Sequence, residues 1–369
     1  MTRGARALLG STLAGLLLLA GCGDKGTSSA PAAHHDPERE HAVAADPHAT
    51  ADEIIDEGQA VRVAETADQT LVAYRPESDD DEGPQQAAWR LYDDGERRVA
   101  DGRLGLVREQ SAIPELTAVG DGFLVESYTG HLLRRVSPAG VISGVPTVRR
   151  ASPARAGDVL LEGYGDTGGR SVYRPADHAA YTLPRLPTAN PQGMVVDHRG
   201  TVWVLLDWRG RSVGVLSSPG GTGPWRRTTV PLQRDGFPEG IAVAGDRVVV
   251  PTAHGKGEVP GLDGIWAYPD DDMRAGWTRT APTGIDLDRS IGVSVDALAD
   301  GRLLVVGDGG AVFLQEAADR PAFTEVGLPR GSRGASVQVS GDALFATFTR
   351  DHQLYRSKDA GDSWQVVRR

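Results

Sequence analysis

The side chains of this chain that could bind or catalyse stand beside short apolar runs. Carboxylate, amide and guanidinium groups come just before such runs, whereas an indole and two imidazoles come just after them. The candidates for ligand binding are Glu115, Gln192, Glu239, Arg333, Trp208, His254 and His352. Charged and amide groups orient a polar ligand, and a histidine can act as a general base or hold a metal. No phosphate-binding loop or paired-cysteine site accompanies them, so these residues form no complete catalytic set.

The apolar runs themselves recur along the chain and must position these candidates. The best-marked runs begin at Leu71, Phe123, Val159, Val202, Val248, Leu303 and Leu344. After the first, each run follows a tight-turn signal such as Gly157-Asp158 or Gly245-Asp246, as hairpins require. Four antiparallel strands in each repeat of about 40–50 residues are typical of a β-propeller blade. The sequence therefore predicts an all-β propeller over 59–369 with seven four-stranded blades, six or eight being alternatives, and with no strand exchanged to close the ring.

This topology places the candidates relative to the ring axis. Glu115, Gln192, Glu239 and Arg333 would enter successive inner strands on one face, which we call the entry face. Close-set carboxylates repel each other, so an arginine or a cation must neutralise them. We therefore expect Arg333 to be the internal partner and a divalent cation such as calcium to be the external one.

The first 58 residues have the sequence pattern of a secretion signal followed by a tether, and not that of a folded domain. Arg3 and Arg6 precede an apolar stretch, which ends in Leu19-Ala20-Gly21-Cys22 with the only cysteine of the chain. A positive start, a short apolar middle and small residues at the cut form a secretion signal. The arrangement resembles lipoprotein signal peptides, which implies a diacylglyceryl group on Cys22 and an extracytoplasmic site on the cell membrane. We expect a signal peptide over 1–21 and a flexible tether rich in His, Asp and Glu over 22–58.

The net charge of the chain limits the classes of molecule that it can be expected to bind. The formal net charge is −11, and cleavage before Cys22 would remove two arginines and no acid. An acidic surface repels phosphate backbones, so we expect no nucleic-acid partner. Nearly all basic residues are arginines, as is typical of actinobacterial proteins.

One motif near the C-terminus has a family resemblance. Ser357, Asp359, Gly361 and Trp364 match the Ser-x-Asp-x-Gly-x-x-Trp turn, or Asp-box, of sialidase-like propellers. In that family, the turn joins the third and fourth strands of a blade on the face opposite the active site. The resemblance implies a structural role for these four residues, because a sialidase would need further Asp-boxes and an Arg-Ile-Pro motif.

Two inner-strand entries carry a second, weaker resemblance. Asn190-Pro191-Gln192-Gly193 and Pro238-Glu239-Gly240 are similar to repeats of NHL, gluconolactonase-like and streptogramin-lyase-like propellers. Gluconolactonase-type enzymes hold a divalent metal with Glu, Asn and Asp side chains. The resemblance implies Asn190, Glu239 and Asp308 as metal ligands in this chain, whereas a tight strand start explains the same dipeptides without a metal.

These observations favour a membrane-anchored, extracytoplasmic propeller that is a non-catalytic binding module. It would be a monomer whose ligand is a protein, a glycan or a small molecule. One alternative is a metal-dependent hydrolase or lyase of the gluconolactonase or streptogramin-lyase type, or a sialidase-like glycosidase. Another is an envelope assembly factor, similar to the Asp-box factors that help to build photosynthetic complexes.

The anchor makes the first testable prediction. Changing Cys22→Ser removes the thiol that would be lipidated, so the protein should leave the membrane fraction or remain unprocessed. Fractionation of cells followed by immunoblotting measures this. Membrane retention equal to that of the wild type would contradict the anchor.

Overall fold

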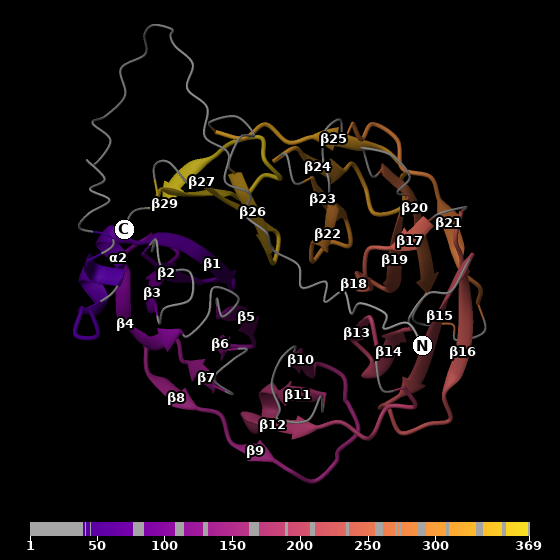
Figure 1. Cartoon of the computed structure of the whole chain (residues 1–369), viewed down its shortest axis with the longest axis horizontal. Helices are drawn as coiled ribbons and strands as arrows, with labels where there is room; N and C mark the ends of the chain where they lie inside the picture. The colour runs from indigo at the N-terminus through magenta and orange to yellow at the C-terminus, as the bar shows by residue number, and fades with distance from the viewer. Residues whose placement is uncertain are drawn as a thin grey trace, which may run out of the picture. The chain divides into compact units, whose positions relative to one another are not determined.

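The computed structural model describes residues 40, 42–44, 46–76, 85–107, 114–127, 132–161, 170–188, 191–206, 211–233, 236–254, 261–269, 272, 275–286, 293–307, 310–329, 335–348 and 352–367. Their strands form seven sheets that are arranged around a centre as the blades of a β-propeller (Figure 1). The predicted seven-bladed all-β propeller is therefore confirmed, and the alternatives of six or eight blades are wrong.

The first blades follow one another in chain order. Blade I contains β1 (Gln59–Glu65), β2 (Gln69–Arg75), β3 (Gln85–Asp93) and β4 (Arg98–Val107). Blade II contains β5 (Glu115–Val119), β6 (Gly122–Ser127), β7 (Leu132–Val136) and β8 (Ile142–Gly144). Blade III contains β9 (Thr147–Val148), β10 (Val159–Leu161), β11 (Ser171–Arg174), the short 3-10 helix η2 (Pro175–Asp177) and β12 (Ala179–Thr182).

The remaining blades complete the ring. Blade IV contains β13 (Gly193–Val196), β14 (Thr201–Leu205), β15 (Ser212–Pro219) and β16 (Arg226–Pro231). Blade V contains β17 (Gly236–Pro238), β18 (Ala242–Ala244), β19 (Arg247–His254), β20 (Gly261–Pro269) and β21 (Thr278–Thr280). Blade VI contains β22 (Val293–Ala297), β23 (Leu303–Gly307), β24 (Val312–Gln315) and β25 (Phe323–Glu325). Blade VII contains β26 (Ala335–Ser340), β27 (Ala343–Phe348), β28 (Leu354–Ser357) and β29 (Gln365–Val367).

Two blades depart from the simple pattern. In blade III the residues from 149 to 158, which include Pro153, form no strand, so β10 is the inner strand of its sheet. The outer edge of that sheet is instead β9, which runs parallel to β12. In blade V both β17 and β18 pair with β19, so the inner strand is interrupted at 239–241. In blade III the Ser152 N–H bonds to the Thr182 carbonyl at 2.9 Å and the Ala154 N–H bonds to the Gly220 carbonyl at 3.0 Å, but Pro153 between them has no N–H with which to continue a strand ladder.

The core of the described residues lies between the blades rather than inside any one of them. Seven clusters of buried apolar side chains occur, and each joins two neighbouring blades. Trp203 and Tyr268, for example, join blades IV and V, with ring centroids 5.3 Å apart. Since a twisted sheet can bury both faces only against its neighbours, stability depends on every one of these interfaces being closed.

The interface between the first and last blades closes the ring without a shared strand. Every strand of blade VII comes from residues 335–367, as the sequence predicted. The free inner edge of β1 is instead met by side chains of β26. The Gln338 amide accepts a hydrogen bond from the Val63 N–H at 3.1 Å and donates one to the Val61 carbonyl at 2.9 Å. The Ser340 hydroxyl accepts a bond from the Glu65 N–H at 2.7 Å.

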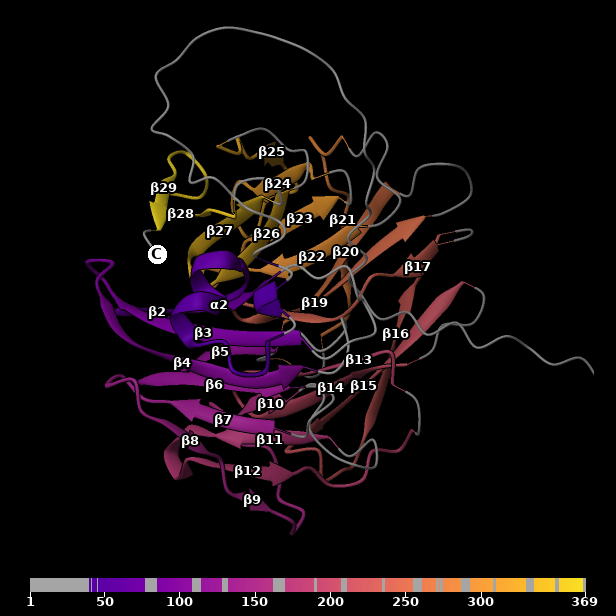
Figure 2. The ribbon, with the colours of Figure 1, turned by 60° about the vertical axis from the view of Figure 1, so that its left-hand side comes forward.

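A helix reinforces this same interface. Helix α2 (Ala51–Glu57) lies against the strands of blade I, as Figure 2 shows. It begins with a capping box: Thr50 accepts a bond from the Glu53 N–H, and the Glu53 carboxylate accepts one from the Thr50 N–H at 2.7 Å. Ile54 and Ile55 are fully buried in the cluster that contains Phe345 and Leu354 of blade VII. The helix therefore adds apolar surface to both sides of the closing interface.

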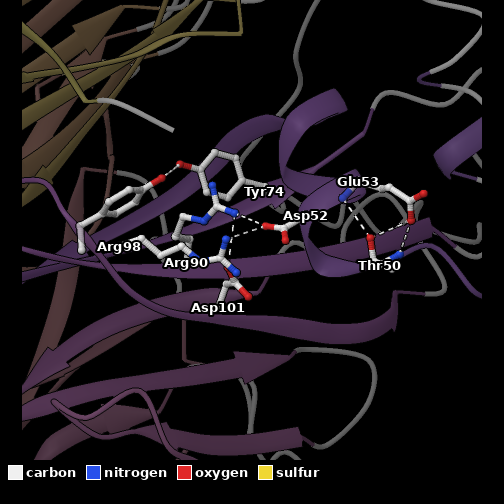
Figure 3. A network of polar contacts seen from close by, with 8 residues as sticks. Thr50, Asp52, Glu53, Tyr74, Arg90, Arg98 and Asp101 are labelled. Carbon is white, nitrogen blue, oxygen red and sulfur yellow. Dashed lines mark hydrogen bonds and ion pairs between the residues drawn. The ribbon is translucent and has the colours of Figure 1, made fainter.

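Ionic contacts hold the exposed side of the helix in place (Figure 3). Asp52 pairs with Arg90 of β3 and, at 3.1 Å, with Arg98 of β4. The same two arginines also pair with Asp101, so two cations and two carboxylates form one network. Residue Glu40 lies against blade VII, where its buried carboxylate is 3.9 Å from the His352 Nδ1.

The predicted tether over 22–58 is wrong in its last part. Residues 50–58 form a capped helix that packs into a core cluster, and Glu40 and Ala44 are buried too. The helix was not predicted from the sequence because its few buried residues stand in a polar tract. Residues 1–39, which include Cys22, lie outside the described residues. Within the described part of the chain, no helix has the length and apolar character needed to cross a membrane.

The turn that carries the Asp-box resemblance joins β28 to β29. Asp359 accepts hydrogen bonds from the Ser357 hydroxyl at 2.7 Å and from the Ser363 N–H at 2.9 Å, and also from the Ser363 hydroxyl. Gly361 has φ of 96°, and a Cβ there would stand 2.3 Å from Val326. The Trp364 indole donates to the Gly327 carbonyl at 2.7 Å, which fixes the turn to blade VI.

The helix generates a stability prediction. Ile54→Ala removes a fully buried side chain from the closing interface, so the free energy of unfolding should fall by about 2–5 kcal/mol. Denaturant titration measures it. Asp68→Ala, at an exposed position in the turn between β1 and β2, is the control and should change the value by less than about 0.5 kcal/mol. Equal stability of the Ile54→Ala protein and the wild type would show that the helix does not support the ring.

The turn generates a prediction about pH. Hydrogen bonds from Ser363 and Ser357 lower the pKa of Asp359 to about 2, below the value near 3.9 expected in an unfolded chain. The ionised carboxylate therefore stabilises the fold above about pH 4, and this stabilisation is lost as the pH falls through 2. Asp359→Ala should lower the melting temperature at pH 7, and the difference from the wild type should shrink between pH 4 and pH 2. A melt of Asp359→Ala that equals the wild type at pH 7 would refute the argument.

Candidate functional site

Solvent reaches the inner strands of the propeller more than it reaches some of the middle strands. The five residues of β14 and the four of β11 are all buried. By contrast, β13, β22 and β26 each have one buried residue and are otherwise half-buried or exposed. The inner strands line the centre of the ring (Figure 1), so the centre is where a ligand could touch several blades at once.

Four blades place polar side chains on these inner strands. Blades I, II, VI and VII supply charged, amide and hydroxyl groups, which we call the polar arc. Its members are Arg62, Glu115, Thr117, Ser294, Asp296, Ser336, Gln338 and Ser340. In β22 the exposed residues Ser294 and Asp296 alternate with less exposed apolar ones, as a strand with one apolar face requires.

A bulge in β1 aims the arginine of the polar arc. The pairing of β1 with β2 shifts between Ala60 and Arg62, which leaves Val61 without a partner in the ladder. The Val61 carbonyl then accepts hydrogen bonds from the Gln338 amide at 2.9 Å and from Nη1 of Arg62 at 3.0 Å. Bulges commonly redirect a side chain in this way. The guanidinium is thus held by its own backbone and by the last blade.

Arg62 in turn binds Glu115 across the boundary between blades I and II. Its Nε lies 3.1 Å from Oε2 of Glu115, and its Nη2 lies 3.1 Å from Oε1. This two-point geometry is the strong form of an arginine–carboxylate pair. Glu115 was predicted from the sequence, and its arginine partner in the structure is Arg62. The expected partner Arg333 lies outside the described residues.

Asp296 of blade VI belongs to the same electrostatic group. Solvent reaches its side chain, yet the surrounding protein desolvates the carboxyl group and raises its pKa, while the positive charge of Arg62 opposes that rise. Solvent exposure of the side chain and desolvation of its carboxyl group occur together when a side chain faces water but is surrounded by protein. Sequence reasoning missed Asp296, although the alternation Val293-Ser294-Val295-Asp296 after a predicted strand start was a usable signal.

The other predicted entry residues stand in other blades. Gln192 is exposed and comes just before β13, with its N–H bonded to the Leu205 carbonyl at 2.9 Å. Glu239 is half-buried at the interruption between β17 and β18, with its N–H bonded to the Pro251 carbonyl at 3.0 Å. Both therefore stand at or within inner strands, as predicted, but in blades IV and V.

The two predicted histidines differ in access. His254 is exposed at the end of β19. His352 is buried beside Glu40, so residues ahead of the propeller cover it in this structure. Trp208, Arg333, Asn190 and Asp308 lie outside the described residues.

The geometry of the described residues does not support a metal site or a serine nucleophile. Within the described ranges, no three His, Cys, Asp or Glu side chains gather closely enough to hold a metal ion. The predicted set Asn190, Glu239 and Asp308 stays a prediction, because only Glu239 is described. The sequence 210–214 fits the pattern Gly-x-Ser-x-Gly, but Ser212 begins strand β15. A nucleophile elbow instead needs a turn from a strand into a helix.

Comparison with known proteins extends only to the fold. No family model matches the chain, and no curated protein matches it. Virginiamycin B lyase from Staphylococcus aureus is 11% identical over 79% of this chain and 92% of its own, with a TM-score of 0.49. A prolyl endopeptidase is 16% identical over 90% and 51%, with a TM-score of 0.48. YCF48 bound to D1 peptide is 12% identical over 79% and 76%, with a TM-score of 0.34. The propeller fold is what these neighbours have in common with the chain.

Proposed function

We propose that this protein is a membrane-anchored, extracytoplasmic binding module whose ligand contacts the polar arc at the centre of the propeller. The observation that carries the proposal is the fixed guanidinium of Arg62. It is held by the Val61 carbonyl and by Glu115, and it lies within electrostatic reach of Asp296. Three blades thus contribute to one preorganised polar group on strands that solvent reaches.

The composition of the inner strands favours binding over catalysis. Strands β1, β5, β10, β13, β17, β18, β22 and β26 contain no histidine, cysteine or lysine. Histidine is the side chain that most often acts as a general base near neutral pH, and cysteine and lysine are common nucleophiles. The acidic groups present are already engaged in part, since Glu115 is paired with Arg62. Such a site can orient a ligand through charge and hydrogen bonds.

A lipid anchor on Cys22 would hold the binding site near the outer face of the cell membrane. Lipidation of Cys22 would leave 17 residues between the anchor and Glu40, the first described residue. A flexible chain of that length spans about 20–25 Å on average. The propeller would therefore stay close to the membrane surface, where a low-affinity ligand site operates at a high local concentration.

The site makes a prediction about ligand screening. A set of metabolites and glycans is tested by thermal shift against the wild type, Arg62→Gln and Asp319→Asn. Asp319 is an exposed acid in the turn between the outer strands β24 and β25 and serves as the control. Compounds that stabilise the wild type should lose their effect with Arg62→Gln and keep it with Asp319→Asn.

Two outcomes would contradict the proposal. Compounds that stabilise Arg62→Gln as strongly as the wild type would place the site elsewhere. A full set without any stabilising compound would argue against a small-ligand module. The circular dichroism spectrum and melting temperature of each variant establish beforehand that the protein is folded.

A further inference from the structure

The outer edge of blades II and III has a charge opposite in sign to the net charge of the chain. Residues 127–157 contain five arginines and no aspartate or glutamate, whereas the whole chain carries a formal net charge of −11. Strands β8 and β9 lie between residues 141 and 148, a segment that has no charged residue. Arg149 and Arg150 follow it directly. We call residues 138–150 the basic edge.

Packing and hydrogen bonds place the basic edge along the outside of three blades. Strands β8 and β9 are the end strands of their sheets, and both lie at the rim of the ring (Figure 1). A Cβ on Gly140 would stand 2.1 Å from the Cβ of Ala100, so the turn before β8 packs against β4 of blade I. The Pro146 carbonyl accepts a hydrogen bond from the Ala180 N–H at 2.8 Å, which joins the edge to blade III. The basic edge is therefore one continuous strip of chain on the outer surface.

The side chains of the basic edge are accessible to a partner. Val141 is 62% exposed, which makes it the most exposed large apolar side chain among the described residues. Pro146 and Thr147 are also exposed. Arg149 and Arg150 are exposed as well, and neither makes an ion pair with another described residue. The edge thus offers apolar surface together with two positive charges.

An uncharged outer strand is unusual in this propeller. The edge of a sheet is commonly protected by charged side chains or by another element, because its free backbone groups can pair with other chains. The outer strands β4, β16, β21 and β25 each carry at least one charged residue, whereas β8 and β9 carry none. Within the described part of the chain, no strand pairs with the outer side of β8 or β9. A partner that covers this edge would therefore come from outside the described residues.

We propose that the basic edge docks on a membrane surface that contains anionic lipids. In this arrangement Arg149 and Arg150 contact lipid phosphates, and Val141 enters the zone between the headgroups and the acyl chains. The inference rests on the membrane-anchored part of the proposed function. It adds a second contact between the protein and the lipid, besides the acyl chains on Cys22.

The position of the N-terminal segment favours a membrane over another acidic partner. The segment that leads back to Cys22 contacts blade I, where the Pro47 carbonyl accepts a hydrogen bond from Nη2 of Arg103 at 2.8 Å. Arg103 belongs to β4, the same strand against which the basic edge packs at Gly140. The anchor and the basic edge would therefore approach the membrane from one side of the ring.

The composition of the edge also fits a membrane surface. Binding at the interface of a membrane grows with the apolar area that enters it and with the attraction of basic side chains to anionic lipids. The basic edge supplies both contributions, through Val141 and through the arginine pair.

The test measures the binding of residues 36–369 to vesicles by co-sedimentation. These residues form a compact unit by themselves and contain all seven core clusters, and they lack Cys22. One vesicle preparation is phosphatidylcholine alone, and the other contains an equal amount of phosphatidylglycerol. At low salt the protein should bind the anionic vesicles about tenfold more tightly. About 1 M salt, where the Debye length is about 3 Å, should remove most of this difference.

A pair of double variants locates the charged part of the contact. Arg149→Gln with Arg150→Gln should weaken binding to anionic vesicles about tenfold or more, because each arginine near such a surface strengthens binding roughly fivefold. Arg279→Gln with Arg320→Gln is the control, since it removes two exposed arginines from blades V and VI and gives the same net charge. The control should leave binding unchanged.

A pair of single variants tests the apolar part of the contact. Val141→Ser should weaken binding about fivefold, because the two methyl groups no longer leave water on docking. Val366→Ser on β29 changes a valine that is 43% exposed and should leave binding unchanged. A thermal melt of each variant establishes beforehand that it is folded.

The outcomes separate this inference from the proposed function. Equal binding to the two kinds of vesicle, or no binding to either, would overturn the membrane-docking surface. Binding to anionic vesicles that both the arginine pair and Val141→Ser leave at wild-type strength would overturn it too. Cell fractionation of Cys22→Ser tests the lipid anchor separately, and Arg62→Gln tests the site at the centre.

Discussion

Closure between the first and last blades is the constraint on which the rest of this structure depends. A propeller ring has no free end only if blade VII packs against blade I, and here no strand is exchanged to join them. Side chains do this instead: Gln338 and Ser340 bind the edge of β1, Arg356 pairs with Glu65, and α2 buries Ile54 and Ile55 in the same interface.

The same contacts that close the ring also build the candidate site. The bulge at Val61 frees a carbonyl, and Gln338 of the last blade and Arg62 of the first blade both bind it. Arg62 then reaches Glu115 of blade II. The position of the guanidinium therefore depends on three blades being assembled correctly. Stability and the geometry of the candidate site are linked at this interface, because a disturbed contact between blades I and VII would displace Arg62.

Repeated turns made the seven-bladed architecture predictable from the sequence, but individual side-chain contacts could not be predicted in this way. Gly-Asp turns before apolar runs identified seven blades, and Glu115 was placed correctly at an inner-strand entry. The helix was missed because Ile54 and Ile55 stand in a polar tract that reads as a tether. Arg62 was missed because its role comes from a bulge and from Gln338, which lies 276 residues away in sequence. Asp296 belongs to the site through the approach of blade VI to Arg62, which only the closed ring brings about.

The most direct test of a ligand site at the centre is amide hydrogen exchange of the protein with and without a compound that stabilises the wild type, but not Arg62→Gln, in the thermal-shift screen. The inner strands are edge strands of their sheets, so a ligand bound at the centre should slow the amide exchange of those it covers. We predict slower exchange in Val293–Ala297, Gly193–Val196 and Ala242–Ala244, with no change in the outer strand β29 or in the turn from Ser357 to Trp364. Slower exchange confined to the outer strands or to that turn, or no change in any inner strand, would contradict the account.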